Sequence, residues 1–67
     1  MPRIESKIEA KHIYYIRKKL ILTQRELAKE LGVSYDTVNS WEQGRRNIGV
    51  VSERKIREFC KKKGIKI

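Results

Sequence analysis

The sequence has little of the chemistry that enzymes and metal sites need. It contains one histidine, His12, and one cysteine, Cys60. These two fall on different predicted helices and lack the spacing of a metal cluster. Its four glycines are scattered and do not form a phosphate-binding loop. We interpret His12 as a partly exposed helix residue and Cys60 as a small core hydrophobe, and expect no enzymatic activity, cofactor or metal.

A single cysteine also excludes an internal disulfide, which suits a reducing cytoplasm. Long apolar runs are missing as well. The run nearest the N-terminus, residues 20–22, is far too short for a signal peptide or a membrane span. We therefore expect a cytoplasmic protein without membrane contact. Residues 1–67 are expected to form one domain, which at this size buries only about 60% of its unfolded surface.

Positive charge is abundant. The chain has 17 Lys and Arg against 8 Asp and Glu, a net charge of +9 that favours a polyanionic partner. Residues 1–31 contribute +4 and residues 45–67 contribute +7, whereas residues 32–44 contain two acids and no base. Attraction to phosphate must therefore come from the flanks, and the middle segment is left to select among bases. The lysine run at residues 61–63 has a second interpretation, a solvated helix end that complements the helix dipole.

Capping signals predict four helices. Ser-Lys-Ile-Glu and Thr-Gln-Arg-Glu capping boxes precede the first two, and serines precede the last two. The predicted helices are residues 7–20, residues 24–31 ending at Gly32, a third capped by Ser34 and ending at Gly44, and a fourth capped by Ser52 and ending near Lys63, before Gly64. Residues 45–51 are expected to form a loop, with room for a short helical turn. No strand alternation is present, so we predict an all-α, compact four- to five-helix bundle.

Residues 24–43 have the pattern of two crossing helices. Ala28 is small enough for a close crossing, and Gly32 tolerates the left-handed turn that follows a helix end. Val33 is the apolar plug of that turn. The predicted core is apolar at helical spacing on every helix: Ile13, Ile16, Leu20, Leu27, Ala28, Leu31, Val38, Trp41 and Phe59. The other face of the second crossing helix carries polar residues, an arrangement that fits a DNA major groove.

The stretches LTQRELAKELGVS and WEQGRR resemble the phage-repressor and Cro-like family of helix-turn-helix DNA-binding domains, the XRE-type transcriptional regulators. The resemblance extends from about residue 13 to residue 46. It implies a lambda-repressor-like fold, with the second crossing helix as the reading helix. The alternative is a generic pair of packed helices.

The resemblance assigns base reading to Tyr35, Asp36, Asn39 and Ser40. Asn39 can bind adenine with two hydrogen bonds, and Asp36 can accept one from a cytosine amino group. Tyr35 can touch a thymine methyl group or a phosphate. The alternative for all four is a solvated helix surface, with Asp36 compensating the helix dipole.

The resemblance also implies contacts that read no base. Expected contacts to the DNA backbone come from Thr23, Gln24, Gln43, Arg45 and Arg46. For Arg46, pairing with Glu42 or simple solvation are alternatives. Arg17 matches a family position that forms an inter-helix ion pair with Glu42, and this structural pair would hold the reading helix at a fixed angle.

Sequence-specific binding of double-stranded DNA by a repressor is the function these residues favour. One alternative is an antitoxin or partner-recruiting module, which a large apolar exposure on the last helix would favour. The other is sequence-indifferent binding of RNA or the ribosome, driven by charge. Two copies on an inverted repeat are expected, because one reading helix buries little surface. The dimer contact is predicted around Ile48, Val50 and Val51, for which ordinary core packing is the alternative.

Overall fold

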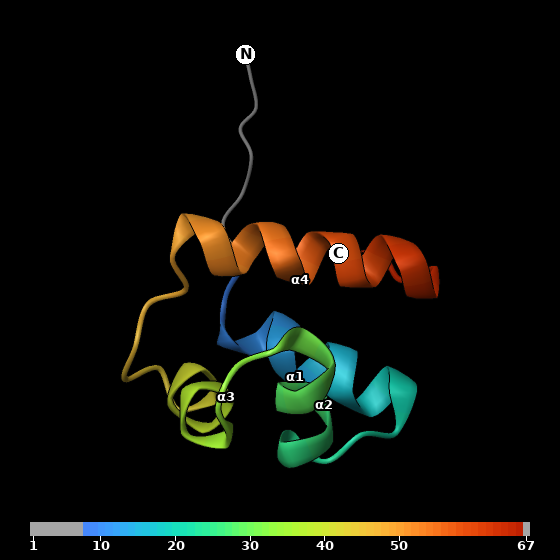
Figure 1. Ribbon diagram of the computed structural model, residues 1–67. Coiled ribbons are helices and arrows are strands. Elements are labelled where there is room, and N and C mark those ends of the chain that lie inside the picture. The colour runs from blue at the N-terminus through green and yellow to red at the C-terminus, as the bar shows by residue number, and fades with distance from the viewer. Residues whose placement is uncertain (1–7, 67) are drawn as a thin grey trace.

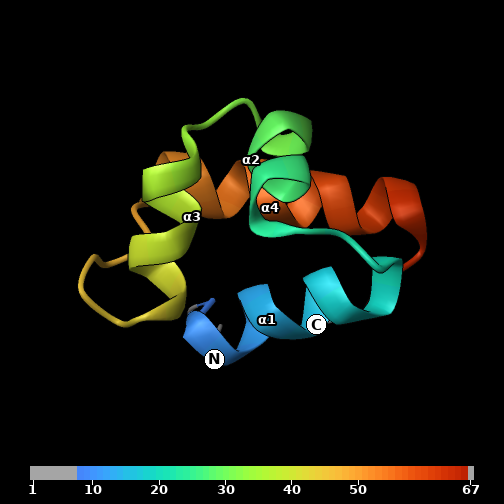
Figure 2. The ribbon, with the colours of Figure 1, turned by 90° about the horizontal axis from the view of Figure 1, so that it is seen from below.

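The computed structural model describes residues 8–66, which form four helices and no strand (Figure 1). The helices are α1 (Ala10–Leu20), α2 (Gln24–Leu31), α3 (Tyr35–Glu42) and α4 (Val50–Lys63). α4 lies across one side of the molecule, and α1, α2 and α3 occupy the other (Figures 1 and 2). The predicted all-α class is confirmed. Within this part of the chain no helix is long and apolar enough to cross a membrane.

α1 begins three residues later than predicted. Glu9 is its N-cap in an extended conformation, and the Glu9 backbone N–H donates to Nδ1 of His12 at 2.8 Å. The ring of His12 thus takes the place that a glutamate has in a capping box, reaching back from the third helical position. His12 is half-buried on the helix, as predicted. Ser6 and Lys7, from which the start was predicted, lie outside the described residues.

α2 and α3 have the predicted capping. The Thr23 hydroxyl accepts from the backbone N–H of Glu26 at 3.1 Å, and the Glu26 carboxylate accepts from the backbone N–H of Thr23 at 2.8 Å. Gly32 ends α2 at φ 72°, the left-handed conformation expected of it. The Ser34 hydroxyl accepts from the backbone N–H of Thr37 at 3.2 Å and starts α3. The helical residues of α3 end at Glu42, two positions before the predicted glycine.

α4 starts two residues before Ser52, so the predicted cap is wrong. Gly49 is the N-cap, with an extended backbone at φ −73° and ψ 171°, and its carbonyl accepts from the backbone N–H of Glu53 at 2.8 Å. Ser52 therefore lies inside the first turn. Val50 and Val51, placed in a loop by the sequence, are helical, and residues 45–49 contain no helical turn. The end of α4 at Lys63 is as predicted.

The core fills the space between the four helices. α2 packs against α3 and α4, and α1 packs against α3. All of the predicted core residues are buried except Leu20, which lies at the edge of the cluster. The cluster also contains Cys60, as interpreted from the sequence, together with Ile8, Ile56 and Ile65. Ile48 packs against this cluster too, which is the alternative of ordinary core packing given for it above.

Candidate nucleic-acid interface

One face of α3 packs against the core, and the polar residues of its first turn are exposed. Val38 and Trp41 are buried against the core, whereas Tyr35 and Asp36 in the first turn are exposed and Asn39 is half-buried. The left-handed turn at Gly32 and the cap at Ser34 set the position at which α3 begins after α2. α3 is therefore anchored by its apolar stripe while polar groups remain at its surface.

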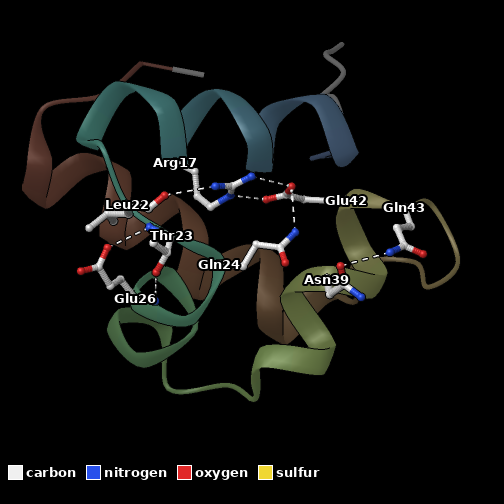
Figure 3. Close-up of polar contacts among 8 residues, drawn as sticks. All are labelled: Arg17, Leu22, Thr23, Gln24, Glu26, Asn39, Glu42 and Gln43. Carbon is white, nitrogen blue, oxygen red and sulfur yellow. Dashed lines mark hydrogen bonds and ion pairs between the residues drawn. The ribbon is translucent and has the colours of Figure 1, made fainter.

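Asn39 on α3 is joined to Gln43, the C-cap residue of that helix. The Gln43 side-chain amide donates to Oδ1 of Asn39 at 3.1 Å (Figure 3). An amide oxygen has two lone pairs, so Asn39 keeps one acceptor site, and its amide nitrogen keeps its two donors. The side chain therefore retains the donor and acceptor pair that recognition of adenine requires.

Ser40 does not face outward, contrary to the sequence expectation. Its exposed fraction is 7%. The chain turns back on α3 at Gly44, where φ is 74°, and the backbone N–H of Arg45 donates to the Ser40 carbonyl at 3.0 Å. A side chain with so little exposed surface has no room for a base edge.

The pair of Arg17 and Glu42 joins three helices (Figure 3). Arg17 donates from Nε to Glu42 Oε2 at 2.6 Å and from Nη2 to Oε1 at 3.0 Å, while its Nη1 donates to the Leu22 carbonyl at 3.1 Å. The Gln24 side chain donates to Glu42 Oε1 at 3.1 Å. The two charged side chains are only 17% and 11% exposed. The network therefore links α1, the start of α2 and the end of α3.

The hydrogen bond to Glu42 raises the pKa of Arg17 above its usual value, and partial burial opposes part of that shift. The guanidinium therefore stays charged throughout the physiological range. Because this charge neutralises Glu42, the negative charge that the sequence places on α3 is reduced to Asp36. That carboxylate lies in the first turn of α3, where the helix dipole favours a negative charge.

The residues expected to touch the DNA backbone lie in two groups. Thr23 and Gln24 are at the start of α2, where the Thr23 hydroxyl accepts the capping bond and the Gln24 amide is engaged with Glu42. Gln43, Arg45 and Arg46 are exposed after α3.

The Arg46 guanidinium lies 3.5 Å from the Thr37 hydroxyl. Glu42, the carboxylate considered as its alternative partner, is instead hydrogen-bonded to Arg17 and Gln24. Arg46 therefore lies along α3 with its charge at the surface.

Arg25, absent from the predicted contacts, lies beside Tyr35, the first residue of α3. Its guanidinium carbon is 4.7 Å from the centroid of the Tyr35 ring. The two residues are ten positions apart, so helical periodicity gives no signal for the contact. Only the crossing of α2 and α3 brings them together.

Within residues 8–66 no group of three potential ligands is placed to hold a metal ion. Cys60 is buried, and this burial raises the pKa of its thiol while the charge of Arg57 partly opposes the shift.

Two helices joined at a left-handed glycine, the second with an exposed polar first turn, define a helix-turn-helix fold. Comparison with protein families matches residues 13–52, more than half of the chain, to the helix-turn-helix family of the Cro/C1, XRE-like type. The chain belongs to this family, whose members are DNA-binding transcription regulators. A search of curated proteins found no match.

Proposed function

We propose that the protein is a sequence-specific repressor that occupies an inverted-repeat operator through the major groove. The observation that carries this proposal is the way α3 is held against the rest of the molecule. Its apolar stripe is buried, its end is tied to α1 through Arg17 and Glu42, and its first turn is polar and exposed. A helix held in this way keeps a fixed angle to the body, which base recognition requires.

Three residues are proposed to read bases. Asn39 binds adenine with two hydrogen bonds, Asp36 accepts one from a cytosine amino group, and Tyr35 contacts a thymine methyl group. Ser40 is left out of this set because it is buried. Arg17 and Glu42 contact no base and set the angle of the helix.

Contacts to the DNA backbone are proposed on both sides of α3. Arg45 and Arg46 supply positive charge after the helix, together with Gln43. Thr23 and Gln24 lie at the start of α2, where free backbone N–H groups favour an anion. These contacts add affinity for any sequence and hold the reading helix in register.

A homodimer on DNA is part of the proposal, with residues 1–67 acting as one domain in the cytoplasm, at the nucleoid when bound. Val50 and Val51 are 75% and 69% exposed at the start of α4. Of the residues in the predicted dimer contact, these two remain exposed, whereas Ile48 packs against the core. Figure 1 shows α4 on one side of the molecule and α3 on the other, so a contact between copies through α4 leaves α3 available to DNA.

Selection of bound sites from a pool of random DNA duplexes tests the proposal. The expected result is an enriched inverted repeat with half-sites about one helical turn, 34–36 Å, apart. A pool that shows no enriched sequence contradicts the proposal. Together with equal affinity for RNA, that outcome supports the charge-driven alternative.

The exposed valines also favour a second candidate, a module that recruits a protein partner, such as the antitoxin of a toxin–antitoxin pair. An exposed apolar surface is used in protein contacts. Two valines make a small patch, which suits a pairing assisted by DNA better than a stable complex with a toxin. Val51→Asp distinguishes a dimer contact from a partner-binding surface. If two copies still bind the operator, the valine patch is not the dimer contact.

A further inference from the structure

The side chains of Arg25 and Tyr35 form a stack across the helix-turn-helix. Arg25 is the second residue of α2 and Tyr35 is the first residue of α3. The guanidinium carbon lies 4.7 Å from the ring centroid, within the range of a cation–π contact. Tyr35 as a residue is nevertheless 41% exposed. One side of the ring is therefore covered by Arg25, and the rest is open to a ligand.

Arg25 differs from Arg17 in the groups that its guanidinium contacts. An open hollow of about 450 Å³ is lined by Arg17, Thr23, Gln24, Arg25 and Tyr35. Within it, Arg17 and Gln24 are both bonded to Glu42. No carboxylate among residues 8–66 pairs with Arg25, whose contact is the Tyr35 ring. The orientation of this guanidinium is therefore set by the ring, and the orientation of the ring by the guanidinium.

An aromatic residue at the first position of a helix has no preceding turn to pack against. Its ring is restrained only by neighbours from other elements. Here α2 supplies that neighbour, because a guanidinium is planar and stacks on an aromatic face, whereas an ammonium is a point charge. Restraining the ring before DNA arrives lowers the entropy cost of binding and narrows the set of bases that it fits.

We propose that Arg25 is a positioning residue that holds Tyr35 against α2 and thereby sets the preference for the base pair that Tyr35 meets. The inference rests on the proposed function, since it concerns the specificity of the same reading helix. Arg25 acts through the ring and not through its charge alone. Replacing it with lysine therefore keeps the charge and removes the planar stack.

The test measures binding to the selected operator, to variants of it at each base pair, and to a random duplex. Arg25→Lys is expected to keep affinity for the random duplex and to lose about two- to fivefold of the discrimination at one base pair of each half-site, the value of an exposed stack. Tyr35→Ala is expected to flatten the preference at the same base pair. In a background of Tyr35→Ala, Arg25→Lys should have no further effect there. Tyr35→Phe, which keeps the ring, should remain sensitive to Arg25→Lys.

Lys29→Ala is the matched control, because Lys29 is an exposed base one turn further along α2. It is expected to weaken binding to all duplexes alike. The inference is overturned if Arg25→Lys leaves the discrimination unchanged at every position, or if its effect persists without the ring. It is also overturned if Tyr35→Ala changes no base preference. Failure of the wild-type protein to select any sequence would instead reject the proposed function, so the two failures are distinguishable.

Discussion

Glu42 accepts hydrogen bonds from two helices at once, from Arg17 on α1 and from Gln24 on α2. The Glu42→Ala variant would leave the Arg17 charge with little water and no anion. We expect a loss of about 3–5 kcal/mol in the free energy of unfolding, as for a broken buried pair. Urea denaturation followed by circular dichroism measures this loss.

Glu53 provides the matched control. It pairs with Arg57 one turn along α4 at 2.9 Å, and the two side chains are 25% and 42% exposed. Because solvent screens such a pair, Glu53→Ala is expected to lower the free energy of unfolding by less than about 1 kcal/mol. Equal losses for Glu42→Ala and Glu53→Ala would show that the pair of Arg17 and Glu42 does not hold the helices together.

Burial of Cys60 predicts a dependence of stability on alkaline pH. The pKa of the thiol is raised above its ordinary value of 9.0 in the folded protein. Above that pH the unfolded chain loses the thiol proton while the folded chain keeps it, so stability falls as pH rises through about 9. Cys60→Ala should remove this part of the decline. Thermal unfolding of both proteins from about pH 8 to about pH 10 measures the difference, and parallel curves would contradict the prediction.

At the scale of the helix, the end of α1 is strained. Ile21 is its C-cap at φ 55°, a left-handed conformation, and its side chain is 88% exposed. That conformation costs an L-residue about 1–2 kcal/mol, and a β-branched one is a marked exception there. The backbone still closes the helix, since the Leu22 N–H donates to the Arg17 carbonyl at 2.9 Å.

Ile21→Gly is therefore expected to stabilise the protein. Relief of the strain exceeds the added entropy of the unfolded chain, which leaves a net gain of about 1 kcal/mol in the free energy of unfolding. Ile21→Ala keeps a Cβ atom and should gain less. Urea denaturation of the three proteins gives the order, and a loss of stability in Ile21→Gly would mean that the exposed side chain makes a contact of its own.

Helix boundaries were predictable where the signal is local. The capping box of Thr23 and Glu26 and the glycine at position 32 lie next to the bonds they make, so the bounds of α2 follow from sequence. The start of α4 does not. Ser52 is a good cap by residue type, but Ile48 packs on the core and fixes Gly49 as the extended residue before the helix.

The residues of the candidate site also differ in how far the sequence predicts them. The exposed first turn of α3 and the ion pair of Arg17 and Glu42 follow from the resemblance of the sequence to its family. Ser40 is buried although it does not share the apolar stripe of Val38 and Trp41, and the stack of Arg25 on Tyr35 depends on how α2 crosses α3. Neither has a periodic signal in the sequence.

Variants in α3 and variants in the loop after it should have different effects on DNA binding. Asn39→Ala is expected to weaken binding to the selected operator by about 1–3 kcal/mol and binding to a random duplex hardly at all, because it removes a base contact. Arg45→Ala or Arg46→Ala should weaken binding to both duplexes and reduce the salt slope by about 0.9 for each phosphate that the variant no longer neutralises. Fluorescence anisotropy over a series of salt concentrations measures both effects. Equal weakening on both duplexes for Asn39→Ala would remove Asn39 from the base-reading residues.

For the whole molecule, net charge opposes the pairing of two copies, whereas exposed apolar surface favours it. A net charge of +9 on each copy repels a second copy, and the exposed part of the predicted contact is only Val50 and Val51. DNA lowers that repulsion because its phosphates neutralise the basic flanks. We therefore expect the free protein to be monomeric and to pair on its operator.

Analytical ultracentrifugation with and without a defined duplex measures this stoichiometry. Two copies per operator are expected at saturating protein, and a strict one-to-one complex would contradict the dimer. Val51→Asp should abolish the two-to-one complex while the monomer stays folded, because an acid in the first turn of α4 suits the helix dipole. Lys62→Ala changes the net charge by the same amount at the exposed far end of α4 and should leave two copies bound. If both variants lose the second copy, charge and not the valine surface controls pairing.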